Sequence, residues 1–282
     1  MKSIFSFSII LTLTVLFFGC ETPTEALVDE ASGTQASPST ERIAPAPMTL
    51  EDGLVVDYPF NEGAGTVLYD ASPNHINGFL ESGRWAPGVV GPYALRFRGR
   101  GRVDVPKSTG WPATVGRLPK GSISVWFQYE GIARGATIAP ILYFGDDAGE
   151  NSLIIEVGHP APDERQKLYF TVSVKNEPVQ CFDSNAPLKP GQWYHFVAVV
   201  GDDFNTGYLN GREMVNRHYN AGGPFSHAFF ASAPSPDLFT LAYGAAAVDD
   251  HFTSLMGALD EVRIYDRPLS AVEVRALYAM GK

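Results

Sequence analysis

Short apolar or alternating runs recur along most of the chain, and clusters of Gly, Pro, Asn and Asp separate them. Because successive side chains of a strand point to opposite faces, residues 54, 56, 58 and 60 form one apolar face of the first run. No long helical periodicity interrupts these runs, which is typical of a β-sandwich or jelly roll. The predicted strands are residues 54–60, 67–69, 94–97, 102–105, 122–129, 138–144, 152–157, 167–174, 194–200, 206–209, 239–242 and 259–265.

Two local signals complete this prediction. The pair Asn210-Gly211 favours a two-residue hairpin, because a type I′ turn needs positive φ at both positions. Ser270 and Glu273 have capping-box spacing, so their side chains can satisfy free backbone N–H groups at the start of a helix. Val274 and Leu277 then fall on one helix face. We therefore expect an all-β fold, a two-sheet antiparallel jelly-roll sandwich with a short C-terminal helix.

The last predicted strand places a charge at the head of an apolar row. Strict alternation puts Asp260 on the same face as Val262 and Ile264. Leaving a carboxylate unpaired in apolar surroundings costs several kcal/mol, so backbone donors, an Arg or a cation must meet it. Calcium is the most specific of these three alternatives.

The N-terminal region has the pattern of an export signal. Lys2 precedes an apolar run over residues 4–18, which ends at Gly19 and Cys20 and is short for a transmembrane helix. Residues 20–48 are rich in Thr, Pro, Ser, Ala and Glu and have too little apolar surface to offset the entropy of ordering. We expect a signal peptide over 1–19, a disordered tether over 20–48 and one globular domain over 49–282.

The charge of the chain narrows the range of partners. The formal net charge is −10 at pH 7, which argues against nucleic acid or anionic lipid as a ligand. Neutral glycans remain compatible with it. A metal ion that bridges the protein to an acidic ligand is compatible as well.

Four segments carry a resemblance to a known family: residues 53–65, 70–78, 193–199 and 257–278. With them, the chain from about residue 54 to 278 resembles the concanavalin A-like, laminin-G-like jelly-roll domains of bacterial surface proteins. The N-terminus is similar to a bacterial lipoprotein signal, in which Cys20 becomes the acylated first residue, although Phe17 and Phe18 depart from the usual residues before the Cys. That resemblance implies a lipid-anchored protein of the cell envelope, at the outer membrane or cell surface. An ordinary secretory signal is the alternative.

The resemblance also implies a calcium site. In the family, an Asp-rich loop near the first strands meets the Asp of the final strand, and these positions correspond to Asp70, Asn77 and Asp260 here. Calcium takes six to eight oxygen ligands at about 2.4 Å, and loop carbonyls would complete its shell. The ion would be structural and would join the two ends of the domain. The alternative is that Asp70 makes local turns to the backbone and Asp260 accepts backbone N–H bonds.

The sequence shows no catalytic motif. The Glu-x-Asp-x-x-Glu arrangement of the glucanase branch is absent, and no Gly-x-Ser-x-Gly elbow, phosphate loop or His-Glu-x-x-His zinc motif occurs. His195 alternates with Trp193 and Val197, which predicts a satisfied core or interface histidine. Cys181 has apolar neighbours and is expected to be a buried, inert thiol. We therefore expect a protein without catalytic activity.

Aromatic side chains in loops are the candidates for ligand binding. A pyranose ring stacks its apolar C–H face on an aromatic ring, and Trp111 lies in a polar loop that suits this role. Covering the edge of the sandwich is its alternative role. We expect the domain to recognise carbohydrate or a surface protein. The alternatives are a polysaccharide hydrolase or lyase on the same fold and a protein-binding adhesion module. Further aromatic candidates are Tyr219, Phe225, Phe229 and Phe230.

Overall fold

The computed structural model describes residues 48–132, 134, 136–158, 166–244 and 253–282, except for the side chain of residue 253. These residues belong to one unit, Met48–Lys282. The predicted signal peptide, Cys20 and the tether as far as residue 47 lie outside the described residues. No helix within the described ranges is long and apolar enough to cross a membrane.

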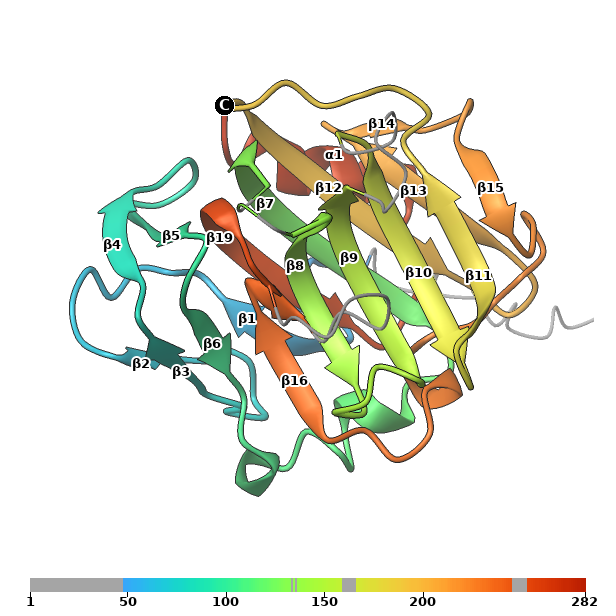
Figure 1. Cartoon of the computed structure of the whole chain (residues 1–282), viewed down its shortest axis with the longest axis horizontal. Coiled ribbons are helices and arrows are strands. Elements are labelled where there is room, and N and C mark those ends of the chain that lie inside the picture. Colours follow the sequence, from blue (N-terminus) through green and yellow to red (C-terminus); the bar gives the residue numbers. More distant parts are fainter. Residues whose placement is uncertain (1–47, 133, 135, 159–165, 245–252) are drawn as a thin grey trace, which may run out of the picture. The chain divides into compact units, whose positions relative to one another are not determined.

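Two antiparallel sheets form the body of the domain, as the alternating runs predicted (Figure 1). The first, sheet A, has the order β14-β13-β12-β7-β19-β5-β4, and β1 also pairs with β19. Its strands are β1 (Leu54–Tyr58), β4 (Arg84–Pro87), β5 (Tyr93–Arg98), β7 (Gly121–Gly131), β12 (Trp193–Val200), β13 (Asn205–Leu209), β14 (Arg212–Glu213) and β19 (Met256–Tyr265).

The second sheet, sheet B, has the order β15-β11-β10-β9-β8-β16-β6-β3-β2. A separate two-stranded hairpin joins β17 (Tyr243–Gly244) to β18 (Thr253–Ser254). The strands of sheet B are β2 (Val67–Leu68), β3 (Gly78–Glu81), β6 (Arg102–Asp104), β8 (Ile138–Gly145), β9 (Ser152–Gly158), β10 (Leu168–Val174), β11 (Glu177–Asp183), β15 (His218–Ala221) and β16 (Leu238–Leu241). Short 3-10 helices occur at Lys107–Thr109, Val115–Arg117 and Phe230–Ser232.

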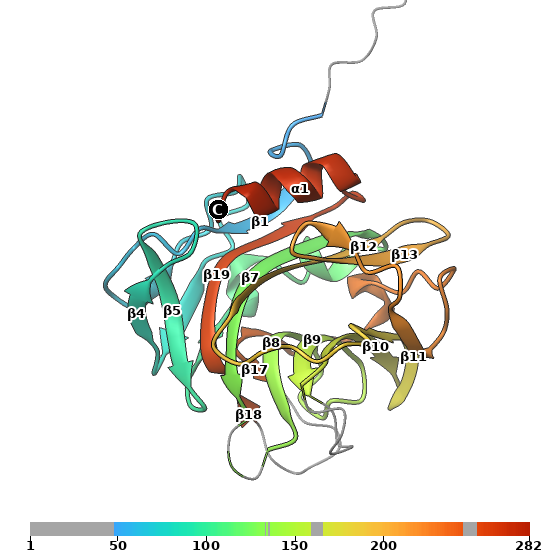
Figure 2. The ribbon, with the colours of Figure 1, turned by 90° about the horizontal axis from the view of Figure 1, so that it is seen from above.

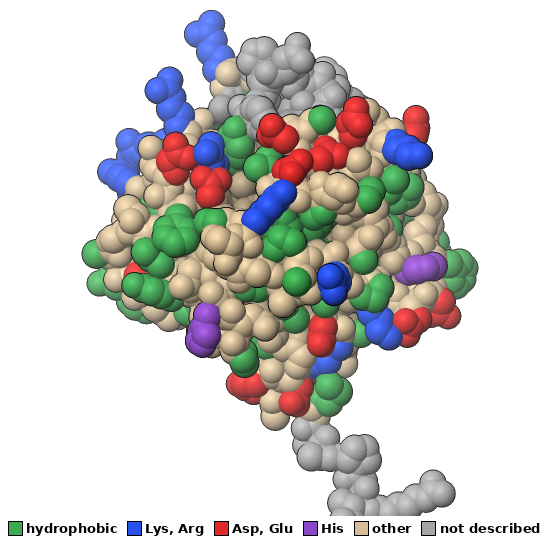
Figure 3. All heavy atoms as spheres, turned by 90° about the horizontal axis from the view of Figure 1, so that it is seen from below, with side chains coloured by type: hydrophobic (Ala, Val, Ile, Leu, Met, Phe, Trp, Pro, Cys, Tyr) green, Lys and Arg blue, Asp and Glu red, His purple; other side chains and the backbone are tan. Residues whose placement is uncertain are grey.

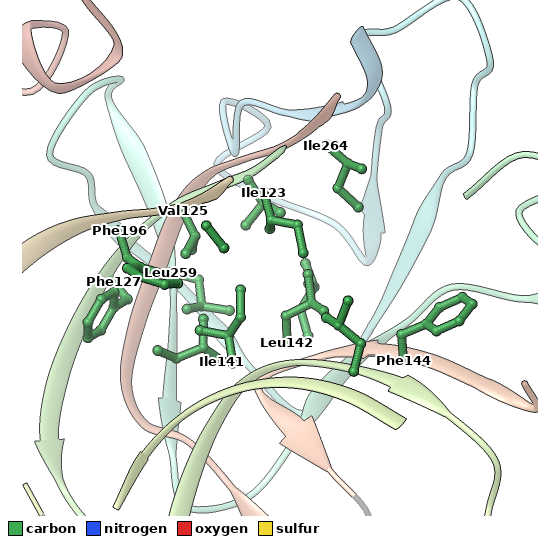
Figure 4. Close-up of a cluster of buried hydrophobic side chains, with 14 of the residues drawn as sticks. Ile123, Val125, Phe127, Ile141, Leu142, Phe144, Phe196, Leu259 and Ile264 are labelled. Atoms are coloured by element: carbon green, nitrogen blue, oxygen red, sulfur yellow. The ribbon is translucent and has the colours of Figure 1, made fainter. Parts of the chain in front are cut away.

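The core lies between the two sheets. Side chains of Ile123, Phe127 and Phe196 from sheet A point toward Ile141 and Phe144 from sheet B (Figure 4). All five are fully buried. Burial of a large apolar side chain contributes about 1.5–3 kcal/mol, so this continuous cluster is the main source of stability.

The single α-helix, α1 (Ala271–Ala279), covers the outer face of sheet A (Figure 2). The predicted capping box is present: Ser270 Oγ accepts from the Glu273 amide at 3.3 Å, and the Ser270 amide donates to Glu273 Oε2 at 2.8 Å. Val274 and Leu277 pack on Val199 in a second apolar cluster. This confirms the predicted helix and its buried face.

The first and last strands of the domain are neighbours, as expected from the resemblance. β1 pairs antiparallel with β19, and Tyr58 faces Val262 across the two strands. The predicted hairpin is also present, because Asn210 and Gly211 both have positive φ between the paired residues Leu209 and Arg212. The two ends of the domain are thus joined in one sheet.

One local prediction is wrong. Strict alternation placed Asp260 on the face of Val262 and Ile264, but a β-bulge lies between Asp260 and Arg263. Glu261 occupies the bulge with φ of 51°, so the side chains after it change face. Val262 enters the core with Leu259, whereas Asp260 pairs with Trp126 and lies on the outer face of sheet A.

Candidate functional site

A line of four polar residues crosses the outer face of sheet B. Cross-strand pairing aligns Glu156 of β9 with Tyr169 of β10, Tyr169 with Asp183 of β11, and Asp183 with His218 of β15. Directly paired residues present their side chains on the same face. The adjacent core-facing residues, such as Ile155 and Phe170, point the other way. We call these four residues the polar row.

Asp183 is the fixed centre of the polar row. Its side chain is fully buried. Oδ2 accepts from Asn220 Nδ2 at 2.9 Å and lies 3.2 Å from His218 Nδ1, while Oδ1 accepts from the Asn185 amide at 2.6 Å. Lys167 Nζ lies 3.8 Å from Oδ1. These contacts set the orientation of the Asp183 carboxyl group in advance.

Glu156, at the other end of the polar row, has different surroundings. Part of its side chain reaches solvent, yet burial of the carboxyl group raises its pKa to about 8. Desolvation disfavours the charged form of an acid, so this carboxyl is mostly protonated at pH 7. It therefore presents one donor and one acceptor, whereas Asp183 has no exposed surface and its oxygens already contact Asn185, His218 and Asn220. The polar row thus offers both kinds of hydrogen-bonding group.

The β17–β18 hairpin covers the part of sheet B next to Glu156. A Cβ atom at Gly244 would lie 3.3 Å from Pro140, 3.4 Å from Tyr143 and 3.5 Å from Ile154. Pro140 is the residue that pairs with Glu156 on β8. The guanidinium of Arg102 lies 4.8 Å from the ring centre of Tyr243, so a cation–π contact also holds the hairpin. Glu156 consequently lies at the edge of the part of this face that the hairpin covers.

Trp111 is not a ligand-binding residue in this structure, which corrects the prediction. Its side chain is fully buried, and Nε1 donates to the Val105 carbonyl at 2.7 Å. Its ring makes edge contacts with Phe144 and Phe239. The residue therefore closes the edge of the core, and no ring face is free for a sugar.

The other predicted aromatic candidates separate into two groups. Phe229 and Phe230 are fully buried in the core, and Tyr219 packs against it. Phe225, in contrast, is 79 % exposed. Of these four, Phe225 offers the most open ring to a ligand.

Asp70 and Asn77 lie close together, and hydrogen bonds to backbone amides hold both side chains. Asp70 Oδ1 accepts from the amides of Asp57 (2.8 Å) and Ser72 (2.9 Å). Oδ2 accepts from the Ile76 amide at 2.7 Å and from Ser72 Oγ at 2.8 Å, and Asn77 Oδ1 accepts from the Asp70 amide at 2.9 Å. Both carboxylate oxygens thus face donors, which a cation would have to displace.

The side chain of Asp260 binds a different loop, the one that contains Val89 and Val90. Its Oδ2 accepts from the amides of Val89 and Val90 at 2.8 and 3.1 Å. Desolvation by burial raises the pKa of Asp260 to about 6, although the backbone donors act in the opposite direction. Oδ1 has no hydrogen-bond partner of normal geometry in the described chain. Among the described residues, these hydrogen bonds connect Asp260 to Val89 and Val90 and not to Asp70 or Asn77.

The predicted three-residue calcium site does not fit these contacts. No group of three or more His, Cys, Asp or Glu residues among the described positions is arranged to hold a metal ion. The donors around Asp70 match the alternative of side-chain-to-backbone turns. Binding of calcium itself remains a prediction for experiment.

Two residues expected to be inert are buried as predicted. His195 Nε2 lies 2.9 Å from Ser124 Oγ, and the ring packs on Trp126. Its Nδ1 has no hydrogen-bond partner among the described residues, so the prediction of a fully satisfied histidine holds for one ring nitrogen only. Burial lowers the pKa of His195 to about 3, so the imidazole is neutral at pH 7. Burial also raises the pKa of Cys181 to about 11, which keeps its thiol protonated.

Sequence reasoning missed the polar row. Glu156 falls inside a predicted strand. Alternation alone places its side chain on the face of the sheet away from the core, because its neighbour Ile155 points into the core. Asp183 was not found, because β11 was not predicted as a strand. The alignment of these two carboxyls depends on the register of three strands, which no local motif encodes.

The comparisons with known proteins agree with this architecture. A family model described as the concanavalin A-like lectin/glucanases superfamily matches residues 111–275. The chain therefore belongs to the concanavalin A-like lectin/glucanase superfamily. No curated protein matches it.

Solved structures show the same fold at low identity. Domain 4 of AbnA, a GH43 extracellular arabinanase from Geobacillus stearothermophilus in complex with arabinotriose, is 20% identical, with a TM-score of 0.54, and the match covers 80% of this chain and 98% of that domain. A mutant Trypanosoma rangeli sialidase with trans-sialidase activity is 16% identical, with a TM-score of 0.53 over 81% of this chain. The matched region spans only 33% of that sialidase.

A third similar structure is from botulinum neurotoxin type C, which depends on interaction with two ganglioside molecules to enter cells. It is 12% identical, with a TM-score of 0.57, and the match covers 82% of this chain and 52% of the toxin chain. Because all three identities are low, these matches support the jelly-roll fold and not a particular ligand.

Proposed function

We propose that this domain binds carbohydrate without catalysing a reaction, and that the polar row on sheet B contacts the sugar. The single observation that carries the proposal is the in-register alignment of Glu156, Tyr169, Asp183 and His218 across four strands. Sugar hydroxyls both donate and accept hydrogen bonds. Glu156, whose raised pKa keeps a proton on its carboxyl, and the exposed imidazole of His218, which Asp183 holds, supply donors and acceptors for them.

The rigidity of the row supports recognition. Asp183 is held by an amide, an asparagine and a histidine before any ligand arrives, so binding requires little reorganisation. Two of the similar structures, the arabinanase domain with arabinotriose and the ganglioside-dependent toxin, concern sugar ligands. These parallels favour carbohydrate over a surface protein as the partner.

A binding measurement with matched variants tests the proposal. We expect a glycan array on the wild-type protein to identify ligands, and calorimetry to show at least tenfold weaker binding for Asp183→Asn. Asp202→Asn removes an exposed carboxylate elsewhere and should bind as the wild type does. Circular dichroism of both variants checks that the fold is retained. An array without any bound glycan contradicts the proposal.

A polysaccharide hydrolase is the second candidate, because one observation favours it. Glu156 and Asp183 lie on one face two strands apart, about 10 Å at the backbone, and inverting glycosidases separate their carboxyls by about 6.5–9.5 Å. A carboxyl with a raised pKa suits the general acid. Release of reducing ends by the wild type, lost in Glu156→Gln, would establish hydrolysis and replace the binding proposal.

We also propose, from the N-terminal sequence alone, that the domain is exported and anchored through lipid on Cys20. The wild type should then partition into the membrane fraction, and Cys20→Ser should release it into the soluble fraction. A wild-type protein that is already soluble would contradict the anchor and leave the carbohydrate proposal unaffected.

A further inference from the structure

An open groove lies at the edge of sheet B, outside the polar row. Its volume is about 490 Å³. Val179 of β11 and the loop that follows β15 supply its walls. We call it the edge groove. Its lining residues are Val179, Gly223, Phe225, Ser226, His227, Ala228 and Ser232.

Hydrogen bonds hold the backbone of the turn that carries Phe225. The Ser226 amide donates to the Gly223 carbonyl at 3.0 Å, which closes the turn. The side chain of Asn205, only 2 % exposed, donates from Nδ2 to the carbonyls of Gly223 (2.8 Å) and Ser226 (2.7 Å). Its own amide donates to the Pro224 carbonyl at 3.0 Å, and its Oδ1 accepts from Tyr219 at 3.1 Å. Asn205 thus fixes three carbonyl groups of the turn around Phe225, those of Gly223, Pro224 and Ser226.

Phe225 is displayed on this turn with most of its surface in water. Its exposed fraction is 79 %, and the neighbouring Val179 is 41 % exposed. A rigid turn that presents an apolar ring loses little conformational entropy when a ligand stacks on it. A ligand can therefore stack on the Phe225 ring at a low cost in conformational entropy, since the backbone of the turn is already ordered.

The chemistry of the groove identifies the occupant. Among the described residues, no Asp, Glu, Lys or Arg side chain lines it, although the whole chain has a net charge of −10. A charged ligand would lose its hydration there without gaining an ionic partner. The lining combines apolar surface with the hydroxyls of Ser226 and Ser232 and the imidazole of His227. A neutral pyranose has the same two characters, an apolar C–H face and a rim of hydroxyls.

We infer that the edge groove is a second saccharide site, in which a neutral pyranose ring stacks on Phe225. The inference rests on the proposed carbohydrate function but places binding at a location distinct from the polar row. The volume of the edge groove, about 490 Å³, lies within the range of about 300–1,000 Å³ that is typical of small-molecule sites. His227, whose Nδ1 lies 3.3 Å from the Phe225 carbonyl, is positioned to contact the sugar hydroxyls through its other nitrogen.

The test uses the full chain and defined neutral probes: methyl β-D-glucopyranoside, methyl β-D-galactopyranoside, methyl α-D-mannopyranoside, cellotetraose and laminaritetraose. Saturation-transfer NMR detects binding, and calorimetry measures affinity. We expect Phe225→Ala to weaken binding of at least one probe about tenfold and Phe225→Trp to retain it. Val272→Ala, which shortens an exposed residue on α1, should leave affinity unchanged.

The results for these variants distinguish saccharide binding at the edge groove from saccharide binding at the polar row. Saccharide binding that is identical in wild type and Phe225→Ala but weakened by Asp183→Asn overturns the groove and keeps the polar row. Binding lost in Phe225→Ala and retained in Asp183→Asn supports the groove. A wild type that binds no saccharide overturns both. If Phe225→Ala changes only the oligomeric state in sedimentation, the groove is a protein contact and the inference is wrong.

Discussion

Arg263 Nε donates to Asp57 Oδ1 at 3.0 Å and joins the last strand of the domain to the first. The same guanidinium contacts Glu261 Oε2 at 3.0 Å from its NH2 group. All three side chains are largely shielded from water. One guanidinium therefore contacts two carboxyl groups at the place where the two ends of the domain meet.

Removal of that cation should destabilise the fold strongly. Arg263→Ala leaves the carboxyls of Asp57 and Glu261 buried without their partner, and breaking a buried pair in this way costs about 3–5 kcal/mol. Urea unfolding measures the change in the free energy of unfolding. Lys120→Ala, which removes the exposed pair with Asp202, should cost less than about 1 kcal/mol. Equal effects of the two variants would contradict the structural role of Arg263.

The stability should fall as the pH rises toward neutrality, in part through Glu261. Burial raises the pKa of Glu261 from 4.5 to about 7, so between these values the folded state retains a proton that the unfolded state releases. The contribution is fully present below pH 4.5 and is lost as the pH passes through about 7. Asp260, with its pKa raised to about 6, acts in the same direction.

Glu261→Gln checks this pH effect because the amide does not ionise. We expect the free energy of unfolding of the variant to change less between pH 4.5 and 7 than that of the wild type. Chemical denaturation at four pH values supplies the comparison. Parallel pH profiles for the two proteins would show that the Glu261 carboxyl does not retain its proton in the folded state.

Asp70 should be required for stability whether or not calcium is present. Its carboxylate accepts from three backbone amides and one hydroxyl, and Asp70→Ala would leave these buried donors unpaired. We expect a loss of about 2–4 kcal/mol in the free energy of unfolding. The predicted calcium ion is tested separately: if it binds the folded domain, a chelator should lower the melting temperature of the wild type by several degrees. An unchanged melting temperature in chelator would contradict the calcium ion.

Saccharide binding at the polar row should weaken in alkaline solution. The raised pKa of Glu156, about 8, means that its carboxyl changes from a donor to a charged acceptor as the pH passes that value. Calorimetry at pH 6.5 and 9 should show weaker binding at the higher pH. Glu156→Gln keeps a donor at every pH, so its affinity should vary less. A wild-type affinity that is constant over this interval would place the ligand away from Glu156.

The sequence by itself determined the β-sandwich, the Asn210-Gly211 hairpin and the capped C-terminal helix. Each depends on local chemistry: alternation of apolar residues, positive φ in a tight turn, and a Ser–Glu cap at a helix start. Each of these signals involves residues that are only a few positions apart in the chain. For that reason they are readable without knowledge of the tertiary structure.

Only the tertiary structure decided which residues meet. The bulge at Glu261 moved Asp260 to the outer face of sheet A, against strict alternation. Burial of Trp111 depends on Phe144 and Phe239, which are distant in sequence. The register of β9, β10 and β11 aligned Glu156 with Asp183. Because a shift of one residue reverses the face of every side chain in a strand, long-range pairing fixes the site and local sequence does not.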